Sequence, residues 1–322
     1  MPLDRLVINT LLATLSALHL FLGASAFVAT GWSAQLFGAH IPVGFSATAA
    51  STWFTQLSGV YAGIFGICMA LCFGQRERCT AFLLMGLSYY LLKLINRFTL
   101  AAQLDVARTP VDITLAVDCV LLILFMTLLL LTSRTSAWVP ERPPEIGLQK
   151  QNSAWISLIH ALTNKRKDPP LGHYVLLGCL LFAMGYHFSQ GITVFLPPEY
   201  VDSIANAYGW SLSTLSAEEF DLGKGYAAYM LVFAVAAALP LIDPPRFGFV
   251  VSLWGLFFLA KGILMIHHYE TLQTQFHASD ARLITQISVM FFLAAAFLYF
   301  AGRNRPARSS PSRHKTPSSV VV

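Results

Sequence analysis

The 322-residue chain contains 56% hydrophobic but only 11% charged residues, and its mean hydropathy is +0.61. A soluble fold of this length needs more polar residues to cover its surface, so the composition predicts an integral membrane protein and excludes a water-soluble one. The net charge of +5 does not indicate nucleic-acid binding. The basic residues lie beside the ends of apolar segments, where anionic lipid headgroups attract them.

Eight apolar segments follow one another along the chain, and each is near the roughly 20 residues that a helix needs to cross a bilayer. They are continuously apolar rather than alternating, which predicts helices and not a barrel, because a helix satisfies its own backbone hydrogen bonds in lipid. The predicted spans are residues 6–30, 57–74, 79–101, 113–133, 172–196, 224–241, 246–267 and 283–302.

The distribution of basic residues predicts the orientation. If the amino terminus is cytoplasmic, 15 of the 21 Lys and Arg residues face the cytoplasm, as the positive-inside rule requires. An even number of spans then places both termini on the cytoplasmic side. We expect a plasma membrane or bacterial inner membrane, with the bilayer and its anionic headgroups on the cytoplasmic face as partners; the sequence identifies no protein partner.

An internal repeat is indicated by "HLFLG" at 19–23 and "HFSQG" at 187–191. Sliding the chain by 168 residues aligns these segments and also aligns Lys93 with Lys261. Matches of His and Lys inside spans are informative, because such residues are rare and costly there. The repeat predicts two four-helix membrane units, 1–134 and 172–302. With four spans each, the units share one orientation and are related by an axis along the membrane normal.

Between the units, residues 135–171 form a predicted cytoplasmic linker. The prolines of "WVPERPPEIG" preclude a regular helix. The following "NSAWISLIHALTNKRK" has apolar residues at helical spacing, which predicts a short helix in the membrane interface, with a solvated linker helix as the alternative. Residues 303–322 are basic and rich in Pro and Ser, which predicts a disordered tail.

The first unit resembles the DoxX-like superfamily of small four-helix membrane proteins. The resemblance rests on a Gly-containing second helix in "LSGVYAGIFGICMALCFGQRERC", a short Arg-bearing turn, a third helix that ends near Arg97, and "RTPVD" before the fourth helix. It covers most of residues 14–134 and, more weakly, 177–302, and it implies the four-helix fold. One namesake group is associated with thiosulfate-to-quinone oxidoreduction, so the resemblance leaves a quinone open as a ligand, although no catalytic motif of that group maps onto this chain.

Ionisable residues in the third and fourth spans form a candidate intramembrane polar site. Lys93 and Arg97 are four residues apart and share a helix face. Asp118 lies at similar depth on the next span, so we expect it to pair with Lys93, and Arg97 to pair with Asp112 or Asp118. Two interpretations stay open, a structural ion-pair network and a polar pocket that opens to the outer face.

The second unit retains Lys261 and Asp280 at the matching positions. Met265 replaces Arg97, and Gln286 replaces Asp118. Because the second unit is less charged, the sequence favours the first unit as the functional one.

His19 and His187 complete the candidate site, near the middle of their helices. Each precedes a glycine by four residues, which places both on one helix face. A hydrogen bond across a closely packed helix interface is the structural interpretation, and a proton relay or a ligand contact is the functional one. Haem is disfavoured, because His173 and His187 would need a matching pair of histidines on a second helix. The sequence predicts no metal site and no cofactor.

Three functional hypotheses remain. The leading one is a membrane protein that binds a small hydrophobic molecule or a membrane partner between its helices. The alternatives are a membrane subunit of a quinone-linked oxidoreductase and a transporter, so enzymatic activity is left open.

Overall fold

The computed structural model describes residues 3–38, 41–42, 44–73, 76–103, 113–134, 171–242 and 244–303. In this part of the chain eight helices are long and apolar enough to cross a membrane, so the predicted all-helical fold with eight spans is confirmed. These helices are α1 (Leu3–Val28), α3 (Ala49–Ala70), α4 (Arg76–Gln103), α5 (Ile113–Arg134), α7 (Leu171–Gly191), α9 (Ala217–Ile242), α10 (Pro244–His267) and α12 (Asp280–Arg303).

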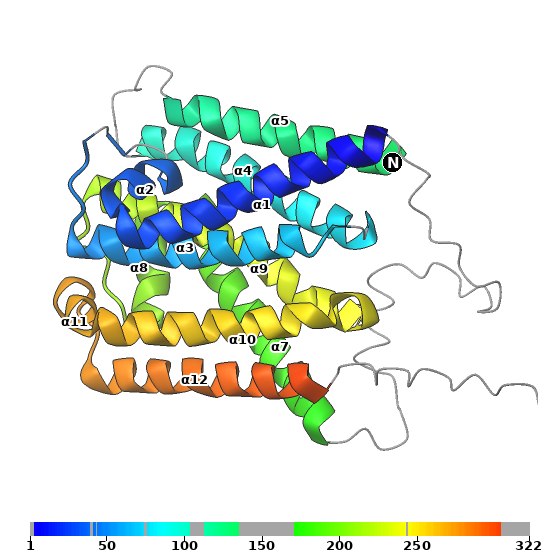
Figure 1. Ribbon diagram of the computed structural model, residues 1–322. Helices are drawn as coiled ribbons and strands as arrows, with labels where there is room; N and C mark the ends of the chain where they lie inside the picture. Colours follow the sequence, from blue (N-terminus) through cyan, green and yellow to red (C-terminus); the bar gives the residue numbers. More distant parts are fainter. Residues whose placement is uncertain are drawn as a thin grey trace, which may run out of the picture.

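Shorter helices lie in the connections between the spans. They are α2 (Thr30–Phe37), the 3-10 helix η2 (Ile192–Phe195), α8 (Pro198–Ala207) and α11 (Tyr269–Phe276). Three of them, α2, α8 and α11, lie at the end of the bundle opposite the N-terminus (Figure 1). We call this the capped end. The predicted linker helix in 135–170 and the predicted tail beyond Arg303 lie outside the described residues.

Two spans begin earlier than hydropathy predicts. The second begins at Ala49 instead of residue 57, and the sixth at Ala217 instead of residue 224. Their first turns carry polar residues such as Gln56 and Glu219, which lower the local hydropathy. Both side chains are buried inside the protein, so they never meet lipid, and a hydropathy window cannot recognise that.

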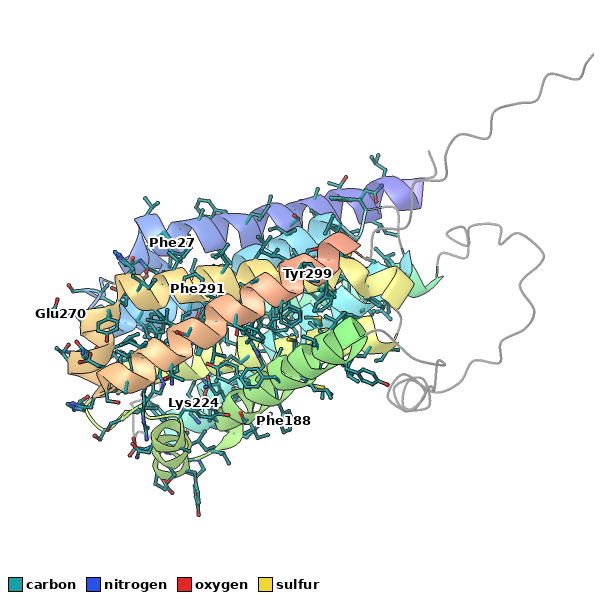
Figure 2. All side chains as sticks on the ribbon, turned by 90° about the horizontal axis from the view of Figure 1, so that it is seen from below. Phe27, Phe188, Lys224, Glu270, Phe291 and Tyr299 are labelled. Atoms are coloured by element: carbon teal, nitrogen blue, oxygen red, sulfur yellow. The ribbon has the colours of Figure 1, made fainter. Side chains whose placement is uncertain are left out.

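Helices α3 and α9 form the centre of the bundle. In their most apolar stretches 78% and 72% of the residues are buried, against 22% to 44% in α1, α5, α7 and α12. Helix α1 packs on α3 and α7 packs on α9, while α4 pairs with α5 and α10 pairs with α12. Large apolar side chains such as Phe27, Phe188 and Tyr299 are exposed on the outer helices (Figure 2). Such an apolar exterior suits contact with lipid.

Glycines allow the closest helix contacts. A β-carbon at Gly23 of α1 would lie 2.9 Å from backbone atoms of Gly59 and Gly63 on α3. At Gly191 of α7 it would lie 2.4 Å from the Leu231 amide nitrogen on α9. The absence of a side chain at these positions lets the backbones approach.

The first turns of α3 and α9 are capped and joined to each other. The Thr48 hydroxyl accepts from the Ser51 amide at 3.1 Å and caps α3. Ser216 and Glu219 form the corresponding capping box of α9, in which the Ser216 amide donates to Glu219 Oε2 at 2.8 Å. The Thr48 hydroxyl also donates to Glu219 Oε1 at 2.5 Å. One carboxylate therefore caps α9 and joins it to α3.

Further contacts connect the two halves of the chain at the capped end. The Trp53 and Trp210 rings are stacked with centroids 6.1 Å apart, and His268 Nε2 lies 2.7 Å from Gln56 Oε1. Burial, with a smaller contribution from His267, lowers the pKa of His268 to about 4. At neutral pH the ring is therefore uncharged and donates from Nε2 to the amide oxygen.

Replacing Glu219 with alanine is expected to destabilise the protein by about 1–2 kcal/mol, because it removes an N-terminal cap and the bond to Thr48 together. Glu218→Ala, one residue earlier and partly exposed, is the matched control and should change stability by less than about 0.5 kcal/mol. Unfolding of both purified variants in detergent measures the difference. Equal stability of the two would show that the joined caps do not hold α3 and α9 together.

Candidate functional site

The first half of the chain contains a buried ion pair. Lys93 Nζ of α4 lies 2.8 Å from Asp118 Oδ1 of α5, and both side chains are 2% exposed. The ammonium also donates to the Leu36 carbonyl near the end of α2. The contact expected from the sequence between Lys93 and Asp118 is thus present. A carboxylate on a neighbouring helix compensates the buried ammonium charge.

Other polar groups surround this pair. Arg97 Nη2 donates to Thr114 Oγ1 at 2.6 Å, while Asp112, its other expected partner, lies outside the described residues. Asn96 Nδ2 lies 3.4 Å from Asp221 Oδ1. Asp221 is 1% exposed and comes from α9, in the other half of the chain. Sequence reasoning missed it, because the hydropathy pattern placed residue 221 in an outer loop.

His19 forms the cross-helix hydrogen bond that the structural interpretation expected. Its Nδ1 lies 2.8 Å from the Leu15 carbonyl, which can only accept, so Nδ1 carries the proton. In the neutral ring Nε2 then accepts from the Tyr90 hydroxyl of α4 at 3.1 Å. The ring is fully buried, so both of its nitrogens are satisfied without water.

His187 has the same environment with one bond fewer. Its Nδ1 donates to the Ala183 carbonyl at 2.7 Å, but Nε2 has no hydrogen-bond partner among the described residues. Phe258 occupies the position 168 residues after Tyr90. Its ring lies 6.0 Å from the His187 ring, as the Tyr90 ring lies 6.1 Å from the His19 ring. Phenylalanine has no hydroxyl, which leaves the His187 nitrogen without a donor.

A large cavity lies in the second half, although the sequence favoured the first half as functional. It holds about 770 Å³ of unfilled space, including its open mouth. Elements that line it are α3, α7, η2, α8, α9 and the segment 208–215, with single residues from α10 and α11. Its lining is mostly apolar and aromatic and includes Trp53, Phe54, Tyr186, Tyr226, Met230 and Phe276. We call it the α7–α9 cavity.

Two buried lysines line the α7–α9 cavity, and each is 3% exposed. Lys224, labelled in Figure 2, donates to the carbonyls of Thr193 at 2.6 Å, Val194 at 3.3 Å and Leu196 at 2.5 Å. It therefore caps the carbonyl end of α7 and η2, where a cation is favoured. All three of its N–H groups have partners. Sequence reasoning missed Lys224, which stands at the edge of the predicted sixth span.

Lys261 is bound differently. Its ammonium donates to the hydroxyls of Tyr186 at 2.7 Å and Tyr226 at 3.0 Å. It also lies 4.7 Å from the centre of the Tyr186 ring and 5.8 Å from that of Tyr226, at distances typical of cation–π contacts. Asp280, the other predicted residue of this half, is exposed at the start of α12 and accepts from Tyr269 at 2.7 Å. The structure does not bring Asp280 to Lys261.

Metal binding has no structural basis in the described ranges. No three His, Cys, Asp or Glu side chains come together there in a way that could hold an ion.

Lys93→Met is expected to destabilise the protein by about 3–5 kcal/mol, because Asp118 would remain buried and charged without its partner. The double variant Lys93→Met with Asp118→Leu should recover much of that loss. Unfolding of the single and double variants, with bound lipids measured in parallel, tests this structural role. A Lys93→Met protein that keeps its stability but loses a bound molecule would instead make the pair a binding site.

Comparisons with protein-family models, curated proteins and solved structures return no match for this chain, so the DoxX-like resemblance stays an interpretation of the sequence motifs.

Proposed function

We propose that this membrane protein binds a small hydrophobic molecule in the α7–α9 cavity. The observation that carries the proposal is a mostly apolar, aromatic cavity with a buried ammonium, that of Lys261, in its wall. Its size is within the range of about 300–1,000 Å³ found for ligand pockets, which combine apolar walls with a few fixed polar groups. Protein interiors are otherwise close-packed, and unfilled space of this size is uncommon in them.

A duplication of a four-helix unit would explain why only one half has this cavity, and we infer such a duplication. The helix bounds support it, because the starts of α1, α2, α3 and α4 lie 168 residues before those of α7, α8, α9 and α10. In the first unit Asp118 pairs with Lys93. In the second unit Gln286 stands at the position of Asp118, and Lys261 faces the cavity.

The proposed ligand site can be tested by filling the cavity. Ala227→Phe adds a ring to a residue of the cavity wall and should reduce co-purified ligand several-fold, since the added atoms occupy the same space. Val235→Phe is the matched control, because Val235 lies on the same helix with 59% of its surface exposed. Mass spectrometry of molecules extracted from both purified variants measures the effect.

Equal amounts of every bound molecule in the two variants would contradict a ligand site in this cavity. A quinone as the molecule that is lost would favour the redox alternative over a simple binding protein.

We further propose that the capped end faces away from the cytoplasm. The concentration of basic residues at the opposite end supports this orientation, and the cavity would then lie toward the outer side. Reporter fusions after Arg134 and at the carboxyl terminus should both report a cytoplasmic location, and an insertion within 205–215 an external one. The reverse pattern would place the cavity toward the cytoplasm.

A further inference from the structure

We propose that the ligand of the α7–α9 cavity carries one negative charge, as does the carboxylate of a single-chain fatty acid, and that this headgroup pairs with Lys261. This inference rests on the proposed function and specifies its ligand. It follows from how the ammonium of Lys261 is surrounded, from the comparison with Lys93, and from the contacts of Lys224.

The charge of Lys261 is buried without a counter-charge. No carboxylate contacts its ammonium among the residues that the structure describes, and its two hydrogen bonds go to neutral phenols. Lysine has three N–H donors, so one donor remains after Tyr186 and Tyr226 are counted. An isolated charge at this depth costs several kcal/mol. An anion in the cavity would remove that cost.

Lys93 shows what such a lysine binds when the protein supplies the anion. At the same position of the first half, Lys93 has the Asp118 carboxylate at 2.8 Å. The corresponding residue of α12 is Gln286, whose amide donates to the Tyr208 carbonyl at 2.9 Å. A neutral amide therefore stands where the first half has its carboxylate. The proposed headgroup supplies the charge that Gln286 lacks.

The other buried lysine does not compete for the anion. Three backbone carbonyls accept the three N–H groups of Lys224. A single ammonium, that of Lys261, therefore recognises the headgroup, and it balances a monoanion. The tyrosine hydroxyls that accept from Lys261 still carry protons that can be donated to a carboxylate. Apolar side chains such as Leu57, Val201 and Met230 line the space left for an alkyl chain.

Three test ligands with the same chain separate charge from hydrophobicity: dodecanoate, dodecanol and dodecylamine. Binding of each labelled compound is measured at pH 8 to the full-length protein in phosphatidylcholine nanodiscs, after subtraction of empty discs. We expect saturable dodecanoate binding at least about tenfold tighter than dodecanol binding, which corresponds to about 1.4 kcal/mol. Dodecylamine should bind least, because it adds a second positive charge.

Variants then assign the preference to one residue. Lys261→Met should abolish the preference for dodecanoate over dodecanol, and Lys261→Arg, which keeps the charge, should retain most of it. Lys224→Met, the matched control, should keep the preference even if it is less stable. Size-exclusion chromatography identifies any variant that does not fold, and the comparison of the three ligands on the unaltered protein decides without variants.

The outcomes distinguish the inference from the function beneath it. Dodecanol binding as tight as dodecanoate binding, or a preference that survives Lys261→Met, overturns the anionic headgroup and leaves the hydrophobic site intact. No saturable binding of any of the three, together with unchanged co-purified molecules in Ala227→Phe, overturns both.

Discussion

The hydrogen bond between Thr48 and Glu219 joins the two helices on which the rest of the bundle is built. A helix that begins inside a protein exposes amide groups that need acceptors, and here one carboxylate meets that need for α9 while it also contacts the cap of α3. Helix α1 packs on α3 and α7 packs on α9, and the remaining long helices complete the bundle around them. The α7–α9 cavity lies beside these first turns, between Trp53 and Phe54 on one side and Lys224 and Tyr226 on the other.

Two buried lysines at matching positions are stabilised in different ways. Lys93 is neutralised by Asp118 and also contacts the end of α2, so its surroundings are closed. Lys261 is held by tyrosine hydroxyls and ring faces at the wall of an open cavity. Phenols stabilise an ammonium without cancelling its charge, and an anion can therefore still bind there with a gain in free energy. The change from Asp118 to Gln286 accounts for this difference with a single residue.

The sequence predicts the spans and the Lys93–Asp118 pair well, because hydropathy reports contact with lipid and because residues on adjacent helices at equal depth can meet. It does not predict Asp221, Lys224 or the true starts of α3 and α9. These residues are polar yet buried by partners far away in the chain, and local hydropathy cannot distinguish them from a loop. The cavity also escapes prediction, since its wall includes α8 and the 208–215 segment, which hydropathy treats as connection.

Each histidine in the repeated segments lies one turn from a glycine on the same helix face. Gly23 sets the interaxial distance between α1 and α3 through backbone contacts at 2.9 Å. That separation also positions α1 so that His19 reaches the Tyr90 hydroxyl on α4. A side chain at residue 23 would push α1 outward and lengthen a hydrogen bond to a helix that it never touches. The four-residue spacing thus makes the geometry of a polar contact depend on the size of a neighbouring apolar position.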